Sequence, residues 1–187
     1  MNTLTQRIKA LSGASDEEIE IFYNASKVVD LSKGEVLLGA GKLCNHYYFI
    51  ESGVIRIYYE KEGKEHTLWF ASAGEMFTHW DSYNNQVPSY HIYKALESTR
   101  VRIISKTANE RLAKEYPFYN TLLRKNLEEV HIHTCKNISA YQSDSALERY
   151  EKLEVQHNWL LRFPLKYISS FLGVTESSLS RIRKTRK

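Results

Sequence analysis

The distribution of glycine divides this chain of 187 residues into two regions of different character. Between Lys27 and Ile104, short runs of β-branched and aromatic residues alternate with glycines, which is typical of short strands joined by turns. No glycine then occurs until Gly173, and residues 106–161 are rich in Leu, Glu, Lys and Arg, which favour helices. The pattern predicts an α+β protein in which a β unit precedes a helical unit.

The runs of the first region recur roughly every 8–12 residues, a spacing typical of a sandwich or barrel. The segment 61–65 (KEGKE) lies between two such runs and predicts a hairpin turn. Ahead of the strands, Ser15 and Glu18 have the spacing of a capping box, which predicts a helix start. The expected strands contain residues 28–29, 36–38, 47–50, 54–59, 67–70, 91–93 and 101–104.

Two helices are expected directly after the β unit. Pro117 suits the first turn of a long helix. Within that helix, Leu123, Leu127, Val130 and Thr134 follow one another at 4-3-4 spacing, which is the seam of a coiled-coil-like contact. Because the seam is shorter than two heptads, a helix packed on its own barrel is the alternative. A second, amphipathic helix is expected at about residues 144–156.

Residues 164–184 have the pattern of two short helices joined by a tight turn, a helix-turn-helix. Gly173 permits the left-handed turn that ends the first helix, and Thr175 is a candidate N-cap of the second. The polar side of the second helix is suited to base edges and phosphates in a major groove, with Arg181 as the first candidate for a base contact. The candidate DNA-binding residues are Thr175, Glu176, Ser177, Ser178, Ser180, Arg181, Arg183 and Lys184.

The net charge of +4 lies entirely in the last quarter of the sequence. Residues 1–140 carry 17 basic and 17 acidic residues, whereas residues 141–187 carry 9 basic and 5 acidic ones. Such a concentration of positive charge at one end of a chain suggests a polyanionic partner. Together with the helix-turn-helix pattern, it favours double-stranded DNA over a tail that is merely solvated.

Composition argues against several other classes of protein. A hydrophobic content of 42% with only 3 Pro is typical of a globular chain rather than a disordered one. No apolar run is long enough for a transmembrane helix, and the first residues lack the apolar core of a secretory signal, so a cytoplasmic protein without a membrane partner is expected. The two cysteines, Cys44 and Cys135, are too few for a disulfide framework or an iron–sulfur cluster, and no cofactor is expected.

The histidines raise the alternatives of a metal site and of a metal-dependent barrel enzyme. His131, His133 and Cys135 have metal-ligand chemistry, but residues two apart on a helix lie on opposite sides. The barrel region contains no His-x-His pair, and no set of residues suits a catalytic arrangement. We therefore expect neither a metal site nor enzymatic activity.

Several of these segments resemble the Crp–Fnr family of transcription regulators, especially its short members. Residues 48–56 (YFIESGVIR) resemble the strand pair of the family's cyclic-nucleotide-type barrel, and residues 73–77 (AGEMF) resemble the approach to its ligand pocket. Residues 173–182 (GVTESSLSRI) fall on the family's helix-turn-helix. The order of barrel, long helix and helix-turn-helix is the specific part of the resemblance.

The resemblance implies three parts. Residues 1–115 would form a double-stranded β-helix, or jelly-roll barrel, with an N-terminal helix, and residues 116–140 would form the dimerisation helix. Residues 141–187 would form the helix-turn-helix domain, with the family's β-hairpin wing missing or reduced. The protein would act as a homodimer on a near-palindromic operator, with Leu123, Leu127 and Val130 at the dimer interface.

The resemblance also implies an effector pocket at Gly74, Glu75, Ser89 and Tyr90. In the family's cyclic-AMP-binding members an Arg-Ser pair holds the cyclic phosphate, and Ser89-Tyr90 occupies that place here. Because a buried phosphate needs a counter-charge, we expect little or no binding of cyclic AMP, and an empty pocket or a less charged effector. The alternative function is a barrel that binds a small ligand and regulates a protein partner through the C-terminal helical hairpin.

Overall fold

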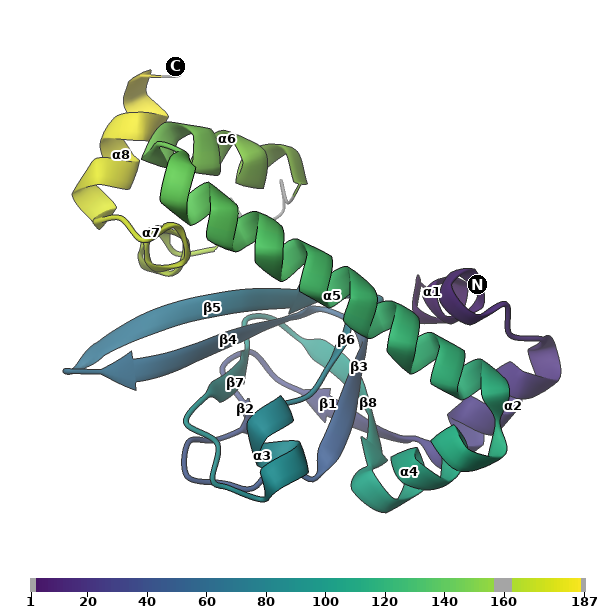
Figure 1. Ribbon diagram of the computed structural model, residues 1–187. Helices are drawn as coiled ribbons and strands as arrows, with labels where there is room; N and C mark the ends of the chain where they lie inside the picture. Colours follow the sequence, from purple (N-terminus) through teal and green to yellow (C-terminus); the bar gives the residue numbers. More distant parts are fainter. Residues whose placement is uncertain (1–2, 157–162, 186–187) are drawn as a thin grey trace.

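The computed structural model describes residues 3–156 and 163–185 (Figure 1). Two short helices come first, α1 (Thr3–Ser12) and α2 (Asp16–Ala25). The expected capping box starts α2: the Ser15 backbone N–H donates to the Glu18 carboxylate, and the Glu18 backbone N–H donates to the Ser15 hydroxyl. The chain therefore enters the β unit from a capped helix.

The strands form two four-stranded antiparallel sheets, with the orders β1-β8-β3-β6 and β2-β7-β4-β5 in the described part of the chain. Side chains from both sheets share one core, which makes the unit the jelly-roll-like barrel that the sequence predicts. The strands are β1 (Lys27–Leu31), β2 (Val36–Leu38), β3 (His46–Ser52), β4 (Val54–Lys61), β5 (Lys64–Ser72), β6 (Met76–Phe77), β7 (Ile92–Ala95) and β8 (Thr99–Ser105).

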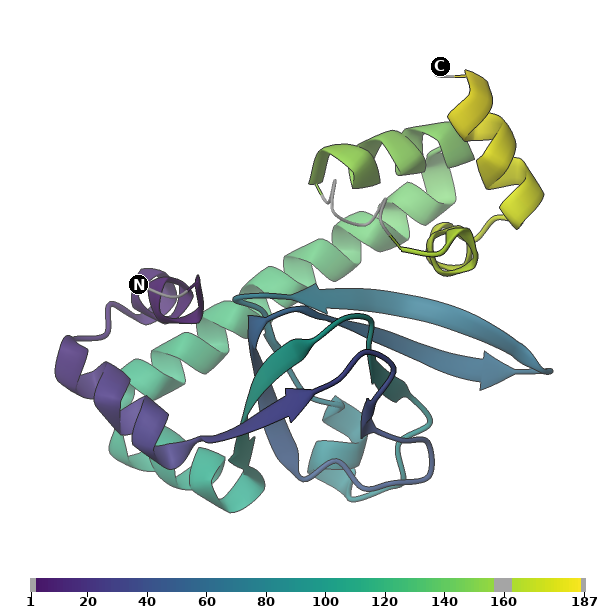
Figure 2. The same cartoon turned by 180° about the vertical axis from the view of Figure 1, so that it is seen from behind.

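Strands β4 and β5 form a long hairpin that projects from the barrel (Figures 1 and 2). Its turn lies at Glu62 and Gly63, as expected, and both residues have positive φ angles of 53° and 72°. Two such residues in succession match the twist of a tight hairpin. The pairing of β4 with β5 shifts by one residue between Ile57 and Tyr58. Strand β5 is an edge strand of its sheet.

Two short elements were not predicted from the sequence, β6 and helix α3 (Trp80–Asn85). The N-cap of α3 is His79, whose Nδ1 accepts from the backbone N–H of Ser82 at 3.1 Å. Histidine is not one of the residues that usually mark a helix start, so the usual signal was absent.

Helix α4 (Lys106–Glu115) leads into the long helix α5 (Pro117–Ser143). Pro117 stands in the first turn of α5, as predicted, and the helix continues three residues beyond the expected end at residue 140. Its first half packs on α1 and on the barrel, while its second half extends away from the barrel to the C-terminal helices (Figure 1). The buried residues of α5 are Phe118, Tyr119, Leu122 and Asn126.

The C-terminal unit consists of α6 (Ala146–Gln156), α7 (Leu165–Leu172) and α8 (Glu176–Thr185). Gly173 ends α7 with a φ of 68°, in the left-handed region that the sequence pattern predicts. The unit rests on the β4–β5 hairpin, and the two parts share one apolar core (Figure 2). The barrel contributes Val54, Phe70 and Leu96 to this core, and the helices contribute Tyr150, Leu153, Phe163, Ile168, Leu172 and Leu179.

Candidate nucleic-acid interface and neighbouring cavities

The turn between α7 and α8 is closed by backbone and side-chain hydrogen bonds. The backbone N–H groups of Gly173 and Val174 donate to carbonyls of the last turn of α7. Thr175 Oγ1 accepts from the backbone N–H of Ser178 at 3.1 Å, so Thr175 caps α8 as its position in the sequence predicts. On the inner side of α8, Leu179 is fully buried. The two helices are therefore held at a fixed angle.

The outer face of α8 is polar and exposed. Ser177, Arg181 and Lys184 are spaced by four and three residues, which puts them on one side of a helix. Glu176 is also exposed and lies in the first turn. Helix α8 lies at the end of the molecule away from α1 and α2 (Figure 1). A helix that presents two cations and short hydroxyl side chains in this way has the groups that phosphates and base edges bind.

The other predicted DNA-binding residues are placed differently. Thr175 and Ser178 take part in the helix cap, and Ser180 is half-buried. Arg183 points toward α6, where its guanidinium carbon lies 5.7 Å from the centre of the Tyr150 ring. The reason is helical periodicity, because Arg183 follows the buried Leu179 by four residues and shares its inner face.

The second half of α5 carries apolar side chains that the described chain covers only in part, and two of them, Leu127 and Val130, also line the cavity between α5 and the barrel. Leu127 is 47% exposed and Val130 is 44% exposed, and both belong to the predicted seam. Ile138 continues the apolar surface toward the C-terminal unit. Leu123, the first residue of the predicted seam, is half-buried and packs against the core under α1 and α2.

A cavity of about 430 Å³ lies between the barrel and α5. Most of its walls are apolar, formed by side chains such as Leu68, Trp69 and Trp80. Among the described residues that line it, Arg7 is the one with a permanent positive charge, and this arginine forms an ion pair with Glu129. The cavity therefore offers apolar contacts and little free positive charge.

Of the four residues predicted for the effector pocket, only Glu75 lines this cavity. Its carboxylate accepts from Trp69 Nε1 at 3.0 Å and from the Ser72 N–H and hydroxyl at 2.6 and 2.8 Å. Gly74 forms the preceding turn with a φ of 90°, and its backbone faces Thr3. The structure thus uses Glu75 to hold Trp69 and a turn in place.

Ser89 and Tyr90 lie apart from the cavity. Ser89 is buried, and its hydroxyl donates to the carbonyl of His91 and accepts from the His91 N–H. Tyr90 is 60% exposed, with its ring against His91 and His79. Burial, with a smaller contribution from the neighbouring His79, lowers the pKa of His91 to about 4. These residues form a separate aromatic cluster on the barrel.

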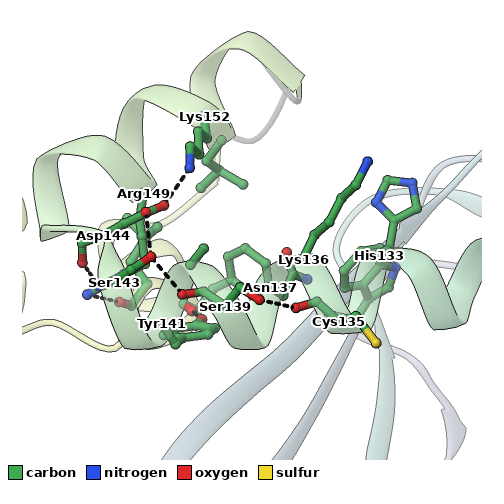
Figure 3. A pocket seen from close by; sticks show the side chains of 15 residues that line it. His133, Cys135, Lys136, Asn137, Ser139, Tyr141, Ser143, Asp144, Arg149 and Lys152 are labelled. Atoms are coloured by element: carbon green, nitrogen blue, oxygen red, sulfur yellow. Dashed lines mark hydrogen bonds and ion pairs between the residues drawn. The ribbon is translucent and has the colours of Figure 1, made fainter.

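A second cavity, of about 540 Å³, lies between the end of α5, α6 and α7, with Trp69 of the barrel on one side (Figure 3). Arg149 donates to the backbone carbonyls of Asp144 and Leu172 at 2.6 and 3.2 Å. Lys152 pairs with the Asp144 carboxylate at 2.6 Å, and this hydrogen bond lowers the pKa of Asp144. Arg149 therefore joins α6 to the end of α5 and to α7, and Lys152 adds a second contact between α6 and the end of α5.

Two of the residues considered above as metal ligands, His131 and Cys135, lie side by side on α5. Cys135 Sγ lies 3.7 Å from His131 Nε2, and the described residues add no third ligand to make a cluster. Cys44 is fully buried. In residues 3–156 and 163–185, no helix is both long and apolar enough to cross a membrane.

Comparison with known proteins places this arrangement among characterised folds. Residues 28–116 match the family model of the cyclic nucleotide-binding domain. A CooA mutant from Carboxydothermus hydrogenoformans is similar with a TM-score of 0.75 and 19% identity, over 99% of this chain and 84% of that one. FixK2 from Bradyrhizobium japonicum is similar with a TM-score of 0.70 and 18% identity, over 86% and 83% of the two chains.

A transcriptional regulator of the Crp/Fnr family from Eubacterium rectale is similar with a TM-score of 0.69 and 15% identity, over 92% of this chain and 83% of that one. A search of curated proteins found no match. At these identities the structural likeness shows a common fold.

Proposed function

Because residues 28–116 form a domain of the cyclic nucleotide-binding family and the described chain has the Crp–Fnr fold, we propose that this protein is a transcription regulator that binds double-stranded DNA as a homodimer. The observation that carries the proposal is the exposed face of α8. Ser177, Arg181 and Lys184 project there from a capped helix that is fixed by a tight turn.

Each side chain on this face has a distinct task in the proposed complex. Arg181 stands in the middle of the face, where a guanidinium can donate two hydrogen bonds to O6 and N7 of a guanine. Lys184 lies one turn further on, where an ammonium can neutralise a phosphate without reading sequence. The carboxylate of Glu176 is an acceptor suited to the amino group of a cytosine.

The homodimer is proposed from the apolar surface of α5. Leu127 and Val130 expose apolar area that a second copy of α5 would bury, and burying apolar surface is the main driving force of association. A twofold axis along this seam would present two copies of α8 to one side of the DNA. Recognition helices about 34 Å apart match successive major grooves, so the operator would be a near-palindrome.

For the effector, we propose that the barrel does not bind cyclic AMP with the affinity of its arginine-bearing relatives. The cavity between barrel and α5 contains Arg7 as its permanent cation, and Glu129 already neutralises that charge. The walls near Trp69 and Trp80 favour a less charged, more apolar molecule.

The test is a selection of bound sequences from a pool of random double-stranded DNA, followed by a gel-shift assay at two salt concentrations. We expect enrichment of one near-palindromic sequence and an affinity that falls as salt rises. Arg181→Ala should weaken binding to the enriched sequence. Arg100→Ala is its matched control, because Arg100 is also an exposed arginine but lies on β8, where it pairs with Asp30. If no sequence is enriched and the protein does not shift DNA even at low salt, the proposal is wrong, and regulation of a protein partner replaces it.

A further inference from the structure

The β4–β5 hairpin contains a buried arginine. Arg56 lies on β4 and is only 1% exposed, although a guanidinium is costly to bury without partners. Its Nε donates to Thr67 Oγ1 at 2.9 Å, and its Nη1 donates to the Glu65 carboxylate at 2.6 Å. Both partners belong to the neighbouring strand β5. The barrel thus supplies the hydrogen bonds and the opposite charge.

The helix-turn-helix supplies the rest of the enclosure. The guanidinium carbon of Arg56 lies 3.9 Å from the centre of the Tyr167 ring, and Tyr167 belongs to α7. It also lies 4.2 Å from the ring of Tyr58 on its own strand. An arginine over an aromatic ring gains both electrostatic attraction and stacking, which a lysine does not reproduce. Arg56 therefore stays fully enclosed only while α7 rests on the hairpin.

One hydroxyl group of α7 also binds the edge of the sheet. Strand β5 is an edge strand of its sheet, so the backbone N–H and C=O groups on its outer side have no neighbouring strand to pair with. Ser170 Oγ accepts from the Thr67 N–H at 2.9 Å and donates to the Glu65 carbonyl at 2.9 Å. The side chain thus takes the place of a paired strand at this point.

Aromatic side chains complete the contact between the two parts. The Phe70 ring of β5 lies 5.5 Å from Phe171 of α7 and 6.4 Å from Phe163, centre to centre. Trp69 meets Phe171 edge to face at 6.3 Å. The contact therefore combines directional polar bonds with an apolar surface, and the polar bonds define one orientation.

We propose that Arg56, Tyr167 and Ser170, here called the interdomain lock, act as positioning residues that set the distance and angle between the two DNA half-sites. This inference rests on the proposed function and deepens it. A dimer reads two half-sites at once only if each helix-turn-helix is held at a fixed angle to α5. The lock holds α7 to the barrel, and the barrel itself is packed on α5.

The experiment uses the selected operator and a variant of it in which two base pairs are inserted between the half-sites. The insertion increases the distance between the half-sites by about 7 Å and rotates one half-site relative to the other by about 70° about the DNA axis. We expect the wild-type protein to bind the lengthened operator at least about tenfold more weakly, because it loses the benefit of two linked sites. Tyr167→Ala and Ser170→Ala should reduce that difference to less than about threefold by loosening the angle.

A third variant, Arg56→Lys, keeps the charge but loses the stacking on Tyr167. It should also reduce the difference in affinity between the two operators. Tyr59→Ala is the matched control, since Tyr59 lies on the same hairpin and its ring stacks on His66 rather than on α7. Binding to DNA with a single half-site should be unchanged in all variants, which shows that the recognition helix is intact.

Two results would overturn the inference. The first is that the Tyr167 and Ser170 variants discriminate between the two operators as strongly as the wild type. The second is that they bind the original operator more tightly, which would mean that the docked orientation opposes binding. Failure of the proposed function differs from both, because the wild-type protein would then select no operator. Amide exchange at Thr67 should accelerate in Ser170→Ala and reports on the docking without DNA.

Discussion

At the scale of single residues, the chemistry of the α8 surface depends on which side of the helix each cation faces. Arg181 is exposed, whereas Arg183 faces Tyr150 across the inner side. Two arginines separated by one residue thus serve different purposes. The first belongs to the face for which we propose DNA binding, and the second packs α8 against α6.

Replacing Arg181 by alanine should therefore change sequence preference. We expect Arg181→Ala to cost about 1–3 kcal/mol in binding to the selected operator and to reduce its advantage over scrambled DNA. Lys184→Ala should instead weaken binding to both DNAs about equally and lower the salt dependence. Competition gel shifts measure both effects. An unchanged preference in Arg181→Ala would remove Arg181 from the base contacts.

His91 gives a second prediction, which concerns pH. Because the pKa of His91 in the folded protein is about 4 and the unfolded value is near 6.5, the unfolded state binds a proton first as pH falls. The free energy of unfolding should be fully retained above about pH 6.5 and should fall between about pH 6.5 and 4. Urea unfolding at several pH values should show a shallower loss in His91→Asn. Equal slopes in the two proteins would contradict the assignment.

At the scale of elements, α5 serves two surfaces along its length. Its first half packs into the core through Phe118, Tyr119 and Leu122, and its second half carries partly exposed apolar side chains, here called the apolar strip. The strip and the buried stripe lie on neighbouring sides of one helix, so the same element can join the barrel and a second copy.

A charge placed in this strip should separate the subunits. In Leu127→Glu two like charges would meet across the twofold seam, and we expect sedimentation velocity to show a monomer instead of a dimer. Leu43→Glu is the matched control, because Leu43 is also an exposed leucine, at 45%, but lies on the barrel. A dimer that survives the Leu127 substitution would place the interface elsewhere.

At the scale of the whole molecule, the two cavities lie on either side of Trp69, which lines both of them. The indole N–H bonds Glu75 in the barrel, and the ring meets Phe171 in α7. Trp69 thus connects the cavity between the barrel and α5 with helix α7.

The residues that line the cavity between the barrel and α5 predict weak binding of cyclic nucleotides. We expect cyclic AMP to bind at least about a hundredfold more weakly than to arginine-bearing relatives, which corresponds to about 2.7 kcal/mol. The reason is that Glu129 already neutralises Arg7, so the phosphate would be buried without its own counter-charge. Calorimetry with cyclic AMP and cyclic GMP measures this. A dissociation constant in the low micromolar range for either would contradict the prediction, and loss of that binding in Arg7→Ala would identify the cation.

Local patterns in the sequence correctly predicted the elements that depend on neighbouring residues. The capping box at Ser15, the turn at Gly63, the first turn at Pro117 and the end of α7 at Gly173 all lie where expected. Helix α3 was missed because its cap is a histidine. In the four correct cases the decisive interaction spans only a few residues, and the residue types involved are the usual signals for a cap or a turn.

The tertiary structure alone decided which side chains meet across the chain. Nothing near Arg56 in the sequence indicates that Tyr167 will cover its guanidinium or that Ser170 will bind the edge of β5. Likewise, the resemblance grouped Ser89 with Glu75, but the folded barrel places only Glu75 at the cavity. Short-range hydrogen bonds and backbone preferences determine the helices and strands. Contacts between distant residues depend instead on how these elements pack, because the packed arrangement is the one that buries the apolar surface of all elements together.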